Sequence, residues 1–138
     1  MLNKLFSLFS SNNKKTDDET TPLPTVAKLQ EKIISELLYD FNNQWNEITL
    51  HFEYFKWKDN YFKKYLSGYK FNNTEGQYTL NIEAIDAIVE LNNEMSKNGN
   101  EKWTWFEFKL DSTGKYNFDF KYGMPPLTKE MLEGAGEI

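Results

Sequence analysis

The stretch that decides the fold lies near the C-terminus, where residues 103–122 read WTWFEFKLDSTGKYNFDFKY. Large apolar residues alternate with polar ones on both sides of the central segment DSTG, and alternation with a period of two is typical of β-strands. The four central residues, 111–114, fit a type I turn closed by a glycine in the left-handed region. The segment therefore predicts an antiparallel hairpin with strands over 103–110 and 115–122.

The two faces of this hairpin differ in character. One is almost entirely aromatic or aliphatic and is expected to pack in the core: Thr104, Phe106, Phe108, Leu110, Tyr116, Phe118, Phe120 and Tyr122. The other is polar apart from two tryptophans: Trp103, Trp105, Glu107, Lys109, Lys115, Asn117, Asp119 and Lys121. Exposed tryptophans beside a polar strand are typical interface anchors, although a loop or a terminal segment could equally cover them.

Upstream of the hairpin, the hydrophobic pattern predicts two helices and two or three strands. The helices are expected over 25–41, with Thr25 as N-cap, and over 82–97, with Asn81 as N-cap and Gly99 just beyond the end. Strands are expected over 45–57 and 61–71, with a brief third strand over 77–80; the spacing of the aromatic residues in 61–67 also fits a short helix.

These elements occur in the order α-β-β-(β)-α-β-β. Consecutive strands without an intervening helix pair antiparallel. We therefore predict an α+β fold, in which two helices pack on one face of a mainly antiparallel sheet of four to five strands.

The predicted domain covers residues 25–122 and is flanked by two weaker segments. Residues 1–24 combine a short amphipathic start with a linker of disordered composition, and the start is either a frayed terminus or a weak contact with a membrane surface or partner. Residues 123–138 are expected to form a flexible tail with one helical turn from Thr128. Since no run approaches the roughly 20 apolar residues of a membrane span, we expect no transmembrane segment.

Composition narrows the possible chemistry. The 138 residues contain no cysteine, no arginine and a single histidine, and the formal net charge is −5. This excludes thiol nucleophiles, cysteine-based zinc sites and arginine forks for phosphate, and the net acidity disfavours nucleic acid. His51 shares a strand face with Glu53, but such a pair is too common to indicate catalysis. We expect no enzymatic activity, no cofactor and no metal.

Three segments resemble the YezG-like immunity proteins. They are NNQWNEITLHFEYF after the first helix, LNNEMSKNGNEKW at the end of the second, and the terminal hairpin. The resemblance rests on a tryptophan-led first strand, a glycine-ended helix followed by Trp-Thr, and a Gly-Lys-aromatic-x-aromatic-Asp-aromatic strand. Those positions here are Trp45, Gly99, Trp103, Thr104, Gly114, Lys115, Tyr116, Phe118, Asp119 and Phe120.

The resemblance implies an antitoxin that binds the toxic domain of a secreted bacterial polymorphic toxin. Many such toxins are basic nucleases, and opposite charge speeds encounter and orients docking. We expect the contact surface on the outward sheet face: Trp103, Trp105, Glu107 and Asp119, with His51 and Glu53 if the strands adjoin. The alternative is an accessory domain that binds a small ligand or carbohydrate through exposed aromatic residues.

Overall fold

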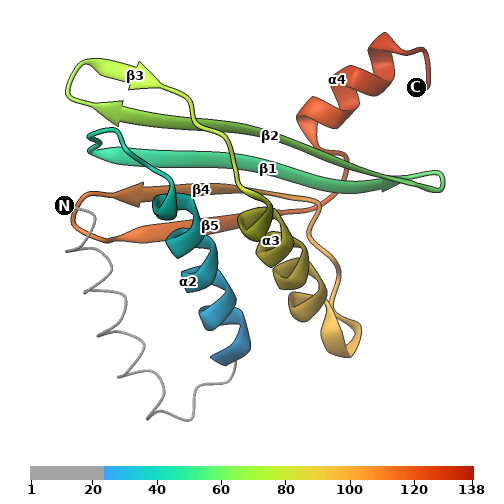
Figure 1. Cartoon of the computed structure of the whole chain (residues 1–138). Helices are drawn as coiled ribbons and strands as arrows, with labels where there is room; N and C mark the ends of the chain where they lie inside the picture. Colours follow the sequence, from blue (N-terminus) through green and yellow to red (C-terminus); the bar gives the residue numbers. More distant parts are fainter. Residues whose placement is uncertain (1–23) are drawn as a thin grey trace.

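The computed structural model describes residues 24–138, which form an α+β domain with one antiparallel sheet (Figure 1). In chain order the elements are α2 (Pro24–Tyr39), β1 (Glu47–Trp57), β2 (Asn60–Phe71), β3 (Thr74–Gly76), α3 (Ile82–Met95), the 3-10 turn η1 (Lys97–Gly99), β4 (Trp105–Asp111), β5 (Tyr116–Lys121) and α4 (Pro126–Gly134). The strand order is β3-β2-β1-β4-β5. The α+β prediction is confirmed, whereas the predictions for residues before Pro24 lie outside the described residues.

The core lies between the sheet and the helices α2 and α3, which pack together on one face (Figure 1). Strand alternation sends Ile48, Leu50 and Phe52 of β1 into this layer, and each is at most 1% exposed. Their partners across the β1–β4 register, Leu110, Phe108 and Phe106, are buried as well. Apolar residues at helical spacing complete the layer: Ile33, Ile34, Leu37 and Leu38 from α2, and Ala84, Ala87, Ile88 and Leu91 from α3.

The terminal hairpin has the predicted turn. The backbone N–H of Gly114 donates to the carbonyl of Asp111 at 3.0 Å, and Gly114 has a φ of +95°. The Asp111 carboxylate also accepts from the backbone N–H groups of Thr113 and Lys115, at 2.9 and 3.1 Å. Since left-handed φ angles cost glycine little, Gly114 suits the position that closes the turn.

The segment 61–71 is a strand, which decides between the two predicted readings. β2 pairs with β1 over eleven positions, from Glu47↔Lys70 to Trp57↔Asn60. A helix over 61–67 would leave that edge of β1 without its hydrogen-bonding partner, and the pairing of the backbone outweighs the local helical spacing.

The third strand and the second helix end differently from their predictions. The third strand was expected over 77–80 but forms at Thr74–Gly76, since Asn72 takes a left-handed φ of +54° and turns the chain back at once. The second helix ends at Met95 rather than 97, and Gly99 is the last residue of the 3-10 turn η1 that follows it. The Asn81 cap is confirmed, because its Oδ1 accepts from the backbone N–H of Ala84 at 2.8 Å.

A further helix, α4, forms where the sequence predicts a flexible tail with one helical turn from Thr128. It spans nine residues on the sheet face opposite α2 and α3, over one end of β1 and β2 (Figure 1). Two of its side chains, Thr128 and Leu132, are buried at 0% and 2% exposure. The prediction failed because the segment is short and polar, so its stability depends on contacts with a distant strand rather than on its own composition.

Candidate functional site

The outer face of the sheet brings together five of the six predicted site residues. His51 and Glu53 alternate with the buried residues of β1 and therefore point away from α2 and α3. The register places Glu107 of β4 opposite His51, and Trp105 opposite Glu53. Asp119 of β5 lies opposite Glu107 on its other side.

Glu53 lies at the N-terminus of α4 and is fully buried. Its carboxylate accepts from the backbone N–H groups of Leu127 and Thr128, each at 2.7 Å, and from the Thr128 hydroxyl at 2.7 Å. The first N–H groups of a helix have no partner within it, and Pro125 at the N-cap has no side-chain acceptor to offer. A carboxylate from β1 thus caps α4 and meets the positive end of its dipole.

His51 bridges this buried carboxylate and an exposed one. Its Nε2 lies 2.6 Å from Glu53 Oε2, and its Nδ1 lies 2.6 Å from Glu107 Oε1. Since both ring nitrogens face carboxylates, both act as donors when the ring is protonated. The chain Glu107–His51–Glu53 therefore connects the open sheet surface to the start of α4.

The pKa values of the two inner groups follow from this chain. Burial alone would lower the pKa of His51, but hydrogen bonds from its ring to Glu53 and Glu107, and their negative charges, raise that pKa above 6.5. Burial alone would raise the pKa of Glu53, but the bonds from His51, from Thr128 and from the Leu127 backbone lower it below 4.5. The arrangement therefore favours the anionic form of Glu53 and the protonated form of His51 relative to the free side chains.

Beyond His51, the outer face carries two exposed carboxylates on adjacent strands. The side chains of Glu107 and Asp119 are 51% and 58% exposed and occupy directly opposite positions. Like charges in that arrangement destabilise a sheet, and here they are offset by His51 beside Glu107 and by Lys121, 3.3 Å from Asp119. The pair makes the part of the outer face that α4 leaves uncovered negatively charged. The half-buried Trp105 lies two residues before Glu107 on the same strand.

Trp103 does not belong to this face, which corrects the prediction for it. It is 1% exposed, and its ring contacts Phe106 and Phe120 at centroid distances of 5.3 and 5.4 Å. The strand begins at Trp105, so the alternation that places Trp105 outward does not extend to Trp103. The buried side chain of Asn92 donates to the Trp103 carbonyl at 2.8 Å and fixes the chain there.

Comparisons with known proteins identify the family. A sequence profile described as "Immunity protein YezG-like" matches residues 51–130, from β1 into α4. The chain belongs to the YezG-like immunity protein family. It is similar to the "Immunity protein YezG" of Bacillus spizizenii strain W23, with 28% identity over 112 residues that cover 72% of this chain and 70% of the relative.

The profile match of this YezG-like protein includes both Glu53 and the start of α4. Sequence reasoning found Glu53, but as a surface residue, and missed the helix that it caps. The sequence does contain two signals for this helix. Pro125-Pro126 is typical of a helix start, because proline suits the first helical position, and Thr128 and Leu132, four residues apart, share one face of a helix.

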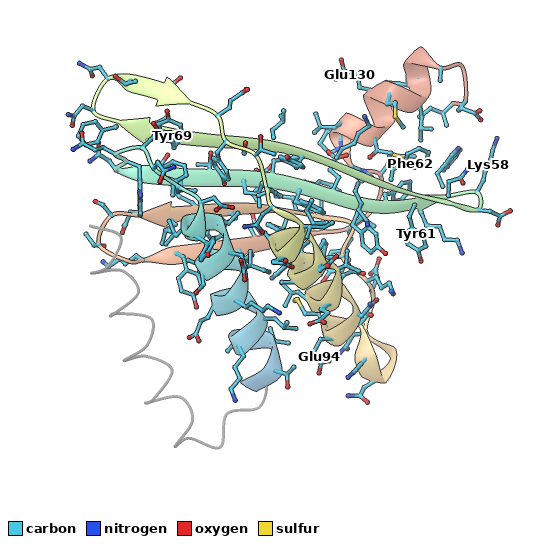
Figure 2. All side chains as sticks on the ribbon, viewed as in Figure 1. Lys58, Tyr61, Phe62, Tyr69, Glu94 and Glu130 are labelled. Carbon is cyan, nitrogen blue, oxygen red and sulfur yellow. The ribbon has the colours of Figure 1, made fainter. Side chains whose placement is uncertain are left out.

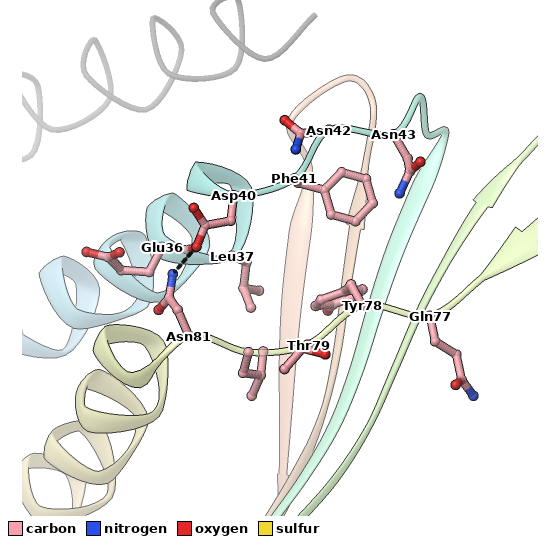
Figure 3. Close-up of a pocket in the computed structure, with 11 residues that line it drawn as sticks. Glu36, Leu37, Asp40, Phe41, Asn42, Asn43, Gln77, Tyr78, Thr79 and Asn81 are labelled. Carbon is pink, nitrogen blue, oxygen red and sulfur yellow. Dashed lines mark hydrogen bonds between the residues drawn. The ribbon is translucent and has the colours of Figure 1, made fainter.

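A polar pocket of about 450 Å³ lies away from the outer face, between the end of α2 and the start of α3 (Figure 3). Three of its lining residues, Glu36, Asp40 and Asn81, hold the two helices together. The Asn81 side chain donates to the Glu36 carbonyl at 3.1 Å and to Asp40 Oδ2 at 3.4 Å, while its oxygen caps α3. The pocket is therefore explained as a junction between helices.

The part of the chain that the structure describes has neither a candidate metal cluster nor a membrane-spanning helix. Over residues 24–138, no group of three or more His, Cys, Asp and Glu side chains is arranged to hold a metal ion. Within the same residues, none of the helices has the length and apolar character needed to cross a bilayer.

Proposed function

We propose that this YezG-like protein is a non-enzymatic, cytoplasmic immunity protein that neutralises a cognate toxin by stoichiometric binding through the outer face of its sheet. The contact residues are Trp105, Glu107 and Asp119. Glu53 and His51 act behind them: Glu53 is buried, and the side chain of His51 is only 13% exposed and supports Glu107.

The observation that carries this proposal is the exposed pair Glu107 and Asp119. Both carboxylates remain more than half exposed although each has a cationic neighbour within the chain. A basic patch on a toxin, such as the surface with which a nuclease holds nucleic acid, would be attracted to them. Trp105 beside the pair offers the aromatic area that interfaces use as an anchor.

The carbohydrate-binding alternative loses its main support. It relied on two exposed tryptophans that could stack on sugar rings, and Trp103 lies in the core. Trp105 alone, half-buried between neighbouring strands, offers a much smaller platform.

The test uses the C-terminal toxin domain encoded beside this gene, co-expressed with the full chain in a bacterial host. Glu107→Lys and Asp119→Lys should each raise the Kd for the toxin by about tenfold or more, since they place like charges against a basic patch, and should weaken the protection of growth. Asp86→Lys on the exposed surface of α3 makes the same charge change and should leave both unchanged.

Far-UV circular dichroism of each variant checks that the fold is intact. Full protection by a folded Glu107→Lys/Asp119→Lys double variant would remove the outer face as the site. A wild-type chain that neither binds the toxin domain nor protects against it would overturn the proposed function itself.

A further inference from the structure

One short segment of this acidic chain is basic and rich in aromatic residues. Residues 54–64 read YFKWKDNYFKK and contain five aromatic residues, four lysines and one aspartate. Their formal net charge is +3, which leaves −8 on the remainder of the chain. Taken over the whole sequence, acidic residues outnumber the lysines around the aromatic residues. In this segment the lysines outnumber the acidic residues.

This basic segment is also set apart in space. The register between β1 and β4 ends at Glu53↔Trp105, while the pairing of β1 with β2 continues to Trp57↔Asn60. Beyond Tyr54 the two strands therefore run on as a two-stranded ribbon without β4 at its edge, and Figure 1 shows this ribbon extending past the ends of β4 and β5. We call residues 54–64 the ribbon.

The projection is long enough to matter electrostatically. About four residues separate Tyr54 from the turn, which at ~3.3 Å per residue is about 13 Å. The Debye length at physiological ionic strength is about 8 Å. Salt therefore weakens the effect of the acidic body on Lys56 and Lys63, while at the tip itself Lys58 is paired with Glu137 and followed by Asp59.

One side of the ribbon forms an ordered platform of tyrosines and lysines. The rings of Tyr54 and Tyr61 stack with centroids 5.0 Å apart. The ammonium of Lys56 lies 5.7 Å from the centre of the Tyr61 ring, and that of Lys63 lies 6.0 Å from the centre of the Tyr54 ring. Tyr61 is 51% exposed. These contacts hold long side chains in place before binding, which reduces the entropy lost when a partner docks.

The other side of the ribbon is the side of α4. Figure 2 shows Tyr61 and Phe62 pointing to opposite sides of the strands, with Phe62 toward α4. Lys58 in the turn pairs with Glu137 beyond the end of α4 at 2.8 Å. The register places Lys64 on this side too, opposite Glu53, whereas Lys56 and Lys63 lie on the side of the tyrosines.

We propose that the ribbon is a second contact on the toxin: the ribbon enters a cleft lined by carboxylates, and Lys56 and Lys63, which point to the sheet face opposite to that of Glu107, lie against one wall of the cleft. The inference rests on the proposed function, because it takes the toxin domain as the occupant. Charge complementarity selects a carboxylate-lined surface, and the narrow projecting shape selects a cleft. Clefts of this kind are where hydrolytic enzymes hold divalent cations, so an ammonium placed there would block activity as well as add affinity.

Two other occupants fit the ribbon less well. The turn at its tip, Lys58-Asp59-Asn60, is polar, whereas insertion into a membrane surface requires apolar residues at the tip. A nucleic acid would be attracted by the lysines, but a strand longer than the ribbon would meet a body of charge −8.

The experiment measures binding and inhibition separately, with the full chain and the purified toxin domain. The charge reversal Lys56→Glu/Lys63→Glu should raise the Kd at least about tenfold, because it sets like charges in the cleft. The milder Lys56→Gln/Lys63→Gln should weaken binding by about three- to tenfold by removing the attraction alone. Lys32→Glu on the exposed surface of α2 is the control and should bind as the wild type does.

Each outcome decides the proposal. Wild-type binding by both folded ribbon variants, with binding lost in Glu107→Lys, overturns the ribbon contact and leaves the proposed function standing. If toxin binding depends neither on the outer sheet face nor on the ribbon, both the proposed contact face and the ribbon contact are wrong. If fluorescein-labelled single-stranded dT20 binds at 150 mM salt and loses affinity in the ribbon variants while toxin binding is unchanged, the ribbon is a nucleic-acid contact and the proposal is wrong.

Discussion

At the scale of single residues, the buried carboxylate of Glu53 is the group on which the outer face depends. It accepts hydrogen bonds from two backbone N–H groups and the Thr128 hydroxyl and is bonded to His51 as well. A buried charge is tolerated when it is paired and fully hydrogen-bonded. Removing the charge leaves several donors with a weaker acceptor.

Glu53→Gln should therefore lower the free energy of unfolding by about 1–3 kcal/mol, the usual cost of leaving buried polar groups poorly satisfied. Chemical denaturation followed by circular dichroism measures it. Glu107→Gln changes an exposed carboxylate with one bond and should have a smaller effect. Equal losses in the two variants would contradict the role given to Glu53.

The pH dependence of stability should reflect both inner groups. The pKa of His51 is raised by folding, so its contribution is complete below pH 6.5 and is lost as the pH rises through the raised value. The pKa of Glu53 is lowered, so its contribution is complete above pH 4.5 and is lost as the pH falls through the lowered value.

The free energy of unfolding should thus be highest at pH values between the lowered pKa of Glu53 and the raised pKa of His51. It should fall as the pH rises through the raised pKa of His51. Urea denaturation across that range measures the fall, and His51→Gln should remove its part of the alkaline loss. An identical alkaline slope in His51→Gln would show that other groups cause it.

At the scale of elements, α4 is a separate unit that is docked on the sheet. Its contacts are with the ends of β1 and β2, and Thr128 and Leu132 are its buried residues. A nine-residue helix is too short to be stable alone in water. Its order therefore depends on the Glu53 cap and on the burial of Leu132.

Leu132→Ala should release α4 while the sheet stays folded. Loss of a buried leucine side chain costs about 2–4 kcal/mol, enough to unseat a short helix. Hydrogen exchange should show faster exchange at the Leu127 and Thr128 amides and little change at core amides of β1. Met131→Ala, at a half-buried position, should have a smaller effect. Uniformly faster exchange in β1 would mean that α4 and the sheet unfold together.

Most elements could be predicted because their own residues carry the pattern. The terminal hairpin alternates cleanly and contains its turn residues, and Asn81 begins α3 as a capping residue does. The features that sequence reasoning missed depend on partners far away in the chain. Helix α4 needs Glu53, more than 70 positions earlier, and the third strand needs the edge of β2.

The candidate site was predicted in part for the same reason. Alternation along β1 and β4 correctly gave the outward direction of His51, Glu107 and Trp105. It could not give the depth of burial, because a covering helix decides that for Glu53. Nor could it place Trp103, because the strand starts two residues later than the alternation suggested.

At the scale of the whole molecule, the charges are segregated. The net charge of the chain is −5, yet the ribbon carries +3. Regions of opposite charge on one small protein orient a partner as well as attract it. A partner in the wrong orientation would place its charges against like charges.

Association with the toxin domain should therefore slow as salt is added. Between about 50 and 500 mM salt, screening should lower the association rate constant roughly tenfold and change the dissociation rate constant much less. Stopped-flow fluorescence follows both. In Glu107→Lys/Asp119→Lys the salt dependence should shrink, and an unchanged salt slope would mean that steering comes from elsewhere on the surface.

The position of His51 gives the molecule a built-in reporter. It is the only histidine in the sequence, so its imidazole C–H signals in a proton NMR spectrum need no assignment by mutation. One nitrogen of that ring touches the carboxylate that caps α4, and the other touches a carboxylate on the proposed contact surface. A single unlabelled resonance can therefore report the seating of the C-terminal helix and the arrival of a partner in the same titration.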